Sequence, residues 1–235
     1  MKKNILITGT PRSGKSTLLK KVIAGYQNKV GFITNEIREK GERVGFEIET
    51  HLGETAVLAH VNFKTSYKVS RYFVDMDNLD AIIPKVKKFS NDKLLFLDEI
   101  GQIELFSEKF RQLVLKYFNS PNSCIATLSK VYSDEFTEKI KTRNDIILIE
   151  ISEENRELKQ KYINALLSKI AKARKYMSEP SRFTVNANQV AMRTDHGTRN
   201  LTEIDQSWTC DCAFFNENKI CSHVIALEGF LSTAK

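Results

Sequence analysis

Hydrophobic positions in the first 175 residues follow two alternating patterns. Short continuous apolar runs are typical of buried parallel strands, and they occur at 3–8, 30–34, 93–97, 123–128 and 145–151. Apolar residues at helical spacing predict helices over 17–26, 78–89, 107–117 and 152–175. The alternation predicts an α/β fold in which helices cover a mostly parallel sheet.

Two segments depart from this simple alternation. Residues 43–50 alternate strictly, with Val44, Phe46 and Ile48 on one face, which predicts a half-exposed antiparallel strand with 54–61 as its partner. Pro84 interrupts the helical pattern of 78–89. The predicted sheet is therefore mostly parallel with an antiparallel excursion.

The pattern changes after residue 175. Residues 177–181 read Met-Ser-Glu-Pro-Ser, which is typical of a linker. Short strands are predicted beyond it, at 182–186, 189–194 and 201–208, followed by a helix at 222–231. We therefore predict a domain over 1–175, a linker over 176–181 and a small β-rich module over 182–235.

The first strand runs into a phosphate-binding motif. Residues 9–16 match G-x-x-x-x-G-K-[ST] between a predicted strand and a predicted helix, as a P-loop requires. Its backbone N–H groups can surround phosphate oxygens; Lys15 would reach the β and γ phosphates, and the Ser16 hydroxyl would bind Mg²⁺. The predicted nucleotide-binding residues are Gly9, Thr10, Pro11, Arg12, Ser13, Gly14, Lys15, Ser16 and Thr17.

Two carboxylates follow the apolar strand at 93–97. Asp98 is placed as the second Mg²⁺ ligand of a P-loop enzyme. Glu99, directly after it, can orient and deprotonate a water molecule for attack on the γ-phosphate. This favours catalysis of hydrolysis by Glu99 together with Lys15, although the sequence leaves open a kinase that places an acceptor there and excludes water.

Further polar residues are candidates for contact with the γ-phosphate. Thr127 and Ser129, at the end of the next strand, could hydrogen-bond the attacking water or the γ-phosphate, or could be ordinary polar residues at a strand end. Spacing does not choose an arginine finger among the five candidates Arg12, Arg38, Arg71, Arg143 and Arg156.

These motifs resemble the thermophilic, or cancer-related, nucleoside-triphosphatase family over about residues 3–170. The segments that carry the resemblance are 9–17, 31–38, 45–48, 71–75, 98–106 and 154–156. The resemblance implies a RecA-like P-loop fold and Mg²⁺-dependent hydrolysis of several nucleoside triphosphates to diphosphates with little base selectivity. It also implies that Glu99 is the catalytic acid–base residue.

Three of the four cysteines lie close together near the C-terminus. Cys210 and Cys212 form a C-x-C pair, and Cys221 and His223, after eight intervening residues, form a C-x-H pair. Four such ligands suit a tetrahedral, structural Zn²⁺ ion. A disulfide explanation fails because three cysteines cannot all pair. Cys124, in an apolar strand, is predicted to be a small buried side chain.

This tail resembles the SWIM zinc finger over about residues 182–232. Its pattern is C-x-C, a variable gap and C-x-H. The segment from Trp208 to Phe215 contains the C-x-C pair, and Cys221 opens a predicted helix. The resemblance implies a DNA-binding or protein-binding module. We therefore expect recruitment of the nucleoside-triphosphatase to nucleic acid or to a protein; the alternatives are a nucleotide-switched nucleic-acid-binding protein and a small-molecule or nucleotide kinase.

Net charge changes this picture little. The formal charge is +7, but residues 171–235 carry eight Lys and Arg against seven Asp and Glu, so +6 of it lies before residue 171. Lysines spread over predicted helix faces are typical of a solvated surface, so charge alone does not identify a nucleic-acid partner. Since no apolar run approaches a membrane span, we expect a cytoplasmic protein without membrane contact.

Overall fold

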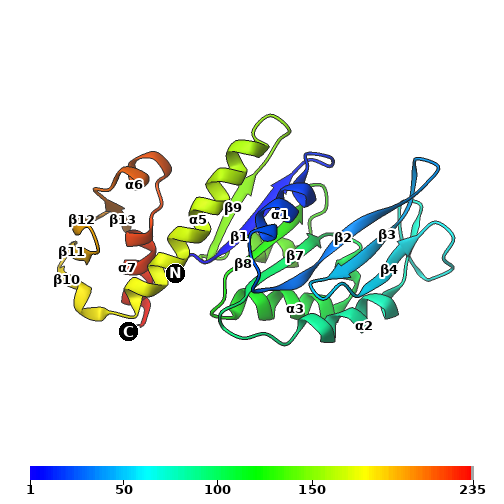
Figure 1. The fold of residues 1–235 in the computed structure, drawn as a ribbon, viewed down its shortest axis with the longest axis horizontal. Helices are drawn as coiled ribbons and strands as arrows, with labels where there is room; N and C mark the ends of the chain where they lie inside the picture. The colour runs from blue at the N-terminus through cyan, green and yellow to red at the C-terminus, as the bar shows by residue number, and fades with distance from the viewer. Residues whose placement is uncertain (234–235) are drawn as a thin grey trace. The chain divides into compact units, whose positions relative to one another are not determined.

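The computed structural model describes residues 1–233, and its contacts divide the chain into two compact units (Figure 1). The N-terminal unit comprises residues 3–161, and the C-terminal unit comprises the chain from Tyr162 onward together with Met1 and Lys2. The division falls inside helix α5 (Arg156–Met177). The predicted boundary at 175 rests on the end of the helical pattern in the sequence, whereas the two compact units meet at residues 161 and 162. The boundary at 175 therefore stays a prediction.

One mixed sheet forms the centre of the N-terminal unit. Its strands lie in the order β5-β6-β4-β3-β2-β7-β8-β1-β9, with parallel pairing from β2 to β9 and antiparallel pairing from β2 to β5. Their bounds are β1 Asn4–Gly9, β2 Lys29–Glu39, β3 Glu42–Thr50, β4 Thr55–His60, β5 Tyr67–Val69, β6 Tyr72–Val74, β7 Leu94–Ile100, β8 Cys124–Ser129 and β9 Ile146–Glu150. The α/β class is confirmed, and the antiparallel part is larger than predicted.

Helices cover both faces of this sheet (Figure 1). They are α1 (Lys15–Ala24), α2 (Met76–Val86), α3 (Glu108–Asn119) and α4 (Glu135–Lys141), with a short 3-10 helix η1 (Glu104–Phe106). α2 continues through Pro84, which lies in its last turn. No helix in the described part of the chain is both long and apolar enough to cross a membrane.

The core is split by the sheet, because successive residues of a strand point to opposite faces. Leu6 packs with α2 and α3, whereas its neighbours Ile5 and Ile7 lie outside that cluster although they are fully buried. The apolar side of α1, including Leu18 and Leu19, is also buried outside that cluster. α1 therefore covers one face of the sheet, and α2 and α3 cover the other.

The C-terminal unit has its own antiparallel sheet. Its four strands follow chain order: β10 Phe183–Asn186, β11 Gln189–Thr194, β12 Gly197–Ile204 and β13 Ser207–Cys210. Two short helices follow, α6 (Ala213–Asn218) and α7 (Ser222–Thr233), and a 3-10 helix η2 (Pro180–Arg182) begins in the predicted linker and ends one residue beyond it. Residues from β11 to α7 form its buried core, among them Met192, Leu201 and Leu227.

The single strand predicted at 201–208 is wrong. The chain reverses at Asp205 and Gln206, whose φ angles of 49° and 62° separate β12 from β13. Two-residue hairpin turns with positive φ at both positions are usually marked by Asn-Gly or Asp-Gly. Here the turn residues are Asp205 and Gln206, so the expected glycine is missing at the second position. For this reason the apolar pattern predicted one strand across the turn instead of two.

A buried tyrosine provides a test of how α2 and α3 are joined. The fully buried Tyr117 hydroxyl of α3 donates a 2.8 Å hydrogen bond to the carbonyl of Val86 at the end of α2. We expect Tyr117→Phe to lower the free energy of unfolding by about 1–2 kcal/mol, since it leaves that carbonyl unpartnered. Urea denaturation measures the change; Tyr67→Phe, at an exposed tyrosine, is the matched control and should be neutral.

Candidate active site

The P-loop connects β1 to α1 in a conformation that depends on glycine. Gly14 precedes the first helical residue and has a φ of 87°, in the left-handed region that favours glycine. A Cβ atom at this position would also lie 2.3 Å from a guanidinium nitrogen of Arg156. A larger residue at this position would therefore strain the loop and displace the Arg156 side chain.

A cavity of about 640 Å³ lies against this loop. The volume is typical of small-ligand sites, which measure about 300–1,000 Å³. Of the residues predicted from sequence, those that line it are Pro11, Arg12, Gly14, Lys15, Ser16, Thr17, Asp98, Glu99 and Ser129. Four other residues that were predicted to contact the nucleotide or its γ-phosphate do not line it: Gly9, Thr10, Ser13 and Thr127.

Asp98 is held by hydroxyl groups from neighbouring elements. Its Oδ1 accepts hydrogen bonds from Ser16 of α1 at 3.0 Å and from Thr127 of β8 at 2.5 Å. The Thr34 hydroxyl of β2 donates to its backbone carbonyl. Burial raises the pKa of Asp98, which is 0% exposed, and the hydroxyl donors and Lys20 oppose that shift. The carboxylate is therefore fixed in position at the end of β7.

The second oxygen of Asp98 has no partner. Oδ2 is buried and accepts no hydrogen bond from the described residues. Buried carboxylate oxygens are normally satisfied, and an unsatisfied one is unfavourable. The other oxygen of the same carboxylate, Oδ1, accepts from the P-loop serine, so this pair of side chains could hold a divalent cation.

Thr127 differs from its predicted position. Its hydroxyl is fully buried and donates to Asp98, so the structure gives it contact with the carboxylate rather than with the cavity. Ser129, two residues later, does line the cavity. The side chains of both residues point to the same face of β8, and only the later one reaches the open end of the strand.

Glu99 meets the P-loop lysine in the cavity. Lys15 Nζ lies 3.6 Å from Glu99 Oε1 and donates a 3.3 Å hydrogen bond to the carbonyl of Gly9. Burial raises the pKa of Glu99; Lys15 opposes that rise, and the charge of Asp98 adds to it. A carboxyl with a raised pKa beside a phosphate-binding lysine can accept a proton at neutral pH.

The arginine candidates separate into two groups. Arg12 and Arg156 line the cavity, whereas Arg38, Arg71 and Arg143 do not. Arg143, for example, pairs with Asp145 at 2.8 Å. Arg43 lines the cavity without having been predicted, and it pairs with Glu36 at 2.8 Å. Arg43 lies on the antiparallel strand β3, and the residues around it in the sequence do not predict that it reaches the cavity.

Sequence reasoning also missed Glu104. This carboxyl is only 4% exposed and lies on the cavity wall beside Glu99: a Cβ atom at Gly101 would be 3.2 Å from Glu104 Oε2 and 3.5 Å from Glu99 Cγ. Burial, followed by the charge of Glu99, raises its pKa well above the ordinary glutamate value. Its spacing of five residues after Glu99 gave no reason to select it.

The C-terminal cysteines form a second cluster, within the C-terminal unit. Donor atoms of Cys210, Cys212, Cys221 and His223 all lie within 4.8 Å of one another. The three sulfurs come from the end of β13, the residue before α6 and the residue before α7, and the histidine lies in the first turn of α7. Cys124 is buried in β8 as predicted, and burial raises its thiol pKa.

Glu104 yields a pH-dependent stability prediction. Its raised pKa means that the folded state binds the proton more tightly, so its contribution to stability is lost as pH rises above the ordinary value of 4.5. We expect Glu104→Gln to make the free energy of unfolding fall less steeply than in the wild type from about pH 5 to 7. Urea denaturation across this range tests it. Glu42→Gln, at an exposed position, should keep the wild-type slope, and an equal slope for Glu104→Gln would contradict the prediction.

Comparison with known proteins agrees with this site. The chain matches the NTPase family over residues 4–164. The nucleoside-triphosphatase THEP1 of Thermotoga sp. (strain RQ2) is 42% identical over 174 residues, 73% of this chain and 95% of that protein. The crystal structure of THEP1 from Aquifex aeolicus is 33% identical with a TM-score of 0.61, covering 70% and 98% of the two chains. A solution structure of a human cancer-related nucleoside triphosphatase is 27% identical with a TM-score of 0.58, covering 68% and 95%. The predicted resemblance to the nucleoside-triphosphatase family is confirmed: the chain is an NTPase and belongs to the NTPase family.

Proposed function

We propose that the N-terminal unit hydrolyses nucleoside triphosphates to diphosphate and phosphate at the P-loop cavity, with Mg²⁺. One observation carries this proposal: Lys15, Ser16, Asp98 and Glu99 face a single cavity although they come from two separate segments of the chain. A phosphate-binding loop, a cation site and a proton acceptor are the groups that triphosphate hydrolysis needs.

The phosphate chain would lie along the P-loop. Backbone N–H groups at the start of α1 and the ammonium group of Lys15 would bind the phosphate oxygens. Ser16 and Asp98 would hold Mg²⁺, which neutralises charge on the phosphates; the unpartnered Oδ2 of Asp98 fits this role. These contacts recognise phosphates rather than the base, which supports broad base specificity.

Glu99 would act as the general base. It would take a proton from a water molecule as the water oxygen bonds to the γ-phosphorus and the bond to the bridging β–γ oxygen breaks. Burial keeps the pKa of Glu99 above the ordinary glutamate value, which makes it a stronger base than an exposed glutamate. Lys15, at 3.6 Å, also holds this carboxylate toward the phosphate site.

The C-terminal unit would hold a structural Zn²⁺ ion. With metal–sulfur distances of about 2.3 Å and a metal–nitrogen distance of about 2.0–2.1 Å, a tetrahedral site separates sulfur from nitrogen by about 3.6 Å. The Nδ1 of His223 lies 3.5 Å from the sulfur of Cys210 and 3.7 Å from that of Cys221. These separations suit zinc and support a SWIM-like module that would recruit the enzyme to nucleic acid or to a protein.

Substitution of the general base tests the hydrolytic proposal. We expect Glu99→Gln to lower kcat by about 10²–10⁴-fold, because glutamine cannot accept the proton. Its melting temperature should stay close to that of the wild type. The wild-type rate should fall on the acidic side with a pKa above the usual glutamate range, since Glu99 must be deprotonated to act.

Release of phosphate from Mg²⁺-ATP at several pH values measures these effects. Glu39→Gln, at an exposed residue at the end of β2, is the matched control and should hydrolyse at the wild-type rate. A wild-type rate for Glu99→Gln would overturn the role of Glu99, and phosphate transfer to an added acceptor in place of release would indicate a kinase.

Metal analysis tests the zinc proposal separately. We expect one Zn²⁺ per chain, lost in Cys221→Ser and kept in Cys124→Ser, whose thiol lies in β8. Chelation should make the C-terminal unit sensitive to limited proteolysis, since a domain of this size depends on its metal for folding. Zinc-free protein of unchanged protease resistance would contradict the proposal.

A further inference from the structure

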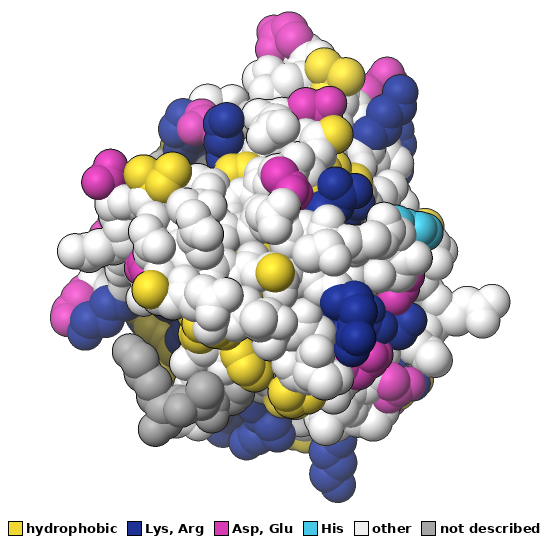
Figure 2. Space-filling model, turned by 90° about the vertical axis from the view of Figure 1, so that its left-hand side faces the viewer, with side chains coloured by type: hydrophobic (Ala, Val, Ile, Leu, Met, Phe, Trp, Pro, Cys, Tyr) yellow, Lys and Arg dark blue, Asp and Glu magenta, His cyan; other side chains and the backbone are white. Residues whose placement is uncertain are grey.

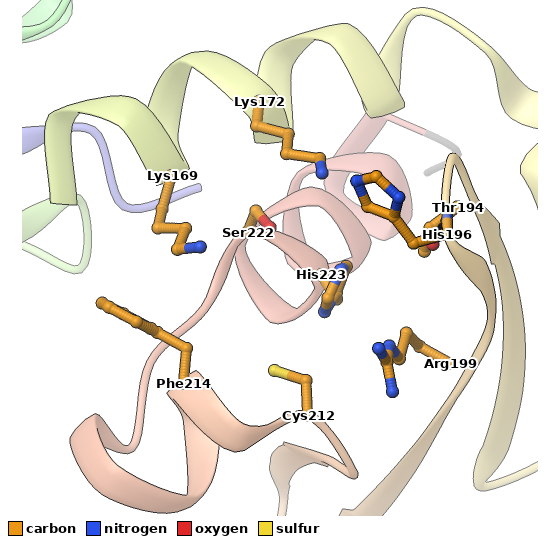
Figure 3. A pocket seen from close by; sticks show the side chains of 9 residues that line it. All are labelled: Lys169, Lys172, Thr194, His196, Arg199, Cys212, Phe214, Ser222 and His223. Carbon is orange, nitrogen blue, oxygen red and sulfur yellow. Dashed lines mark hydrogen bonds between the residues drawn. The ribbon is translucent and has the colours of Figure 1, made fainter. Parts of the chain in front are cut away.

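A second pocket, of about 210 Å³, lies wholly within the C-terminal unit beside the four metal donors. Figure 3 shows that its side chains come from three directions. Lys169 and Lys172 come from α5, His196 and Arg199 from the β11–β12 turn and from β12, and Phe214 from α6. Cys212 and His223 form part of its wall. The pocket therefore exists only where the zinc-stabilised module and the end of α5 come together.

Basic groups dominate this pocket. Lys169, Lys172 and Arg199 carry three positive charges, and no Asp or Glu is among the described residues that line it. Three thiolates around Zn²⁺ would leave one negative charge on the metal centre, so the pocket would still be positive. In Figure 3 the ends of Lys172 and Arg199 point toward the space beside His196 and His223.

Nearby carboxylates offset this charge only in part, since Asp211 lies within ion-pair distance of Arg199 and Asp195 interacts electrostatically with Lys172. Asp195 pairs with Arg182 at 3.2 Å and with Lys175 at 3.7 Å, two cations outside the pocket. Asp211 accepts hydrogen bonds from the backbone and side chain of Asn200 and lies 3.9 Å from Arg199. Among the described residues, Lys169 and Lys172 have no carboxylate within 4.0 Å, and each lies over an aromatic ring instead.

On the face of the molecule that Figure 2 shows, cationic and anionic side chains are interspersed, whereas the charged residues in the described lining of the pocket are all cations. The pocket is also smaller than the roughly 300–1,000 Å³ of sites for whole organic ligands. Its size and charge therefore suit one compact anionic group.

We propose that this pocket binds a single phosphate group, either a free phosphate or one phosphodiester of a nucleic-acid strand. Lys172 and Arg199 would bind the phosphate oxygens, with His196 and the Ser222 hydroxyl as further polar groups on the wall. The inference rests on the proposed zinc-stabilised module, whose donors form part of the wall.

A substitution of Phe214 distinguishes binding of a free phosphate from binding of a nucleic-acid strand. Its ring lies on the pocket wall, with the ammonium group of Lys169 4.7 Å from the ring centre. A base attached to a bound phosphodiester can stack on such a ring, whereas a free phosphate gains nothing from it. Phe214→Leu should therefore weaken binding of a single strand by about tenfold and leave binding of free phosphate unchanged.

The test compares two lysines of the same helix. Lys172 lines the pocket, and Lys161 is exposed outside it. Binding of inorganic phosphate by calorimetry and of a labelled single-stranded oligonucleotide by fluorescence anisotropy is measured on the full zinc-loaded chain. Mg²⁺ and a non-hydrolysable triphosphate analogue fill the P-loop site throughout.

We expect Lys172→Gln to weaken phosphate binding at least severalfold and Lys161→Gln to leave it unchanged. If a nucleic-acid strand is the source, Lys172→Gln should also lower the slope of log affinity against log salt by about 0.7. Binding of phosphate without the oligonucleotide assigns the pocket to free phosphate. No binding of either probe, or equal losses in the Lys172 and Lys161 variants, would overturn the inference.

Zinc content and Mg²⁺-ATP hydrolysis are measured on the same samples. A chain that holds zinc and hydrolyses ATP but binds neither probe refutes only the phosphate pocket. Loss of zinc identifies a failure of the proposed module instead. Lys172→Gln should keep wild-type zinc content and hydrolysis, and Arg199→Gln, from the opposite wall, should reproduce its effect on phosphate.

Discussion

The N-terminal unit depends on the burial of one carboxylate, Asp98. A fully buried charge is costly unless it is partnered. Here hydroxyls from α1 and β8 donate to the carboxylate, and a hydroxyl from β2 donates to the backbone carbonyl of the same residue. These contacts join the P-loop helix to three neighbouring strands of the sheet. The order β7-β8-β1 makes them possible, because it places β8 between the strand that carries Asp98 and the strand that leads into the P-loop.

The same arrangement suits the neighbouring residues Asp98 and Glu99 to different roles. Both carboxylates line the cavity, but Asp98 is held by hydroxyl donors, whereas Glu99, next in the chain, meets Lys15. The two adjacent carboxylates therefore have different surroundings. One is suited to hold a cation in a fixed place, and the other is suited to exchange a proton.

Local sequence signals were sufficient for the P-loop, the two carboxylates and the cysteine–histidine cluster, because each depends on spacing within one short segment. They were insufficient for Arg43 and Glu104, which reach the cavity through the antiparallel strands and the loop after β7. Thr127 was predicted near the phosphate because of its place at a strand end, but its hydroxyl faces Asp98. The helix α4 was also missed, although Asp134 and Thr137 form a capping box at its start.

The central claim is that a water molecule, activated by Glu99, attacks the γ-phosphorus of a nucleoside triphosphate bound at the P-loop. Hydrolysis of Mg²⁺-ATP in ¹⁸O-labelled water tests it most directly, with mass spectrometry of both products. We expect the label to enter inorganic phosphate and to be absent from the diphosphate. Label in the diphosphate, or phosphate transfer to an acceptor without label, would contradict it.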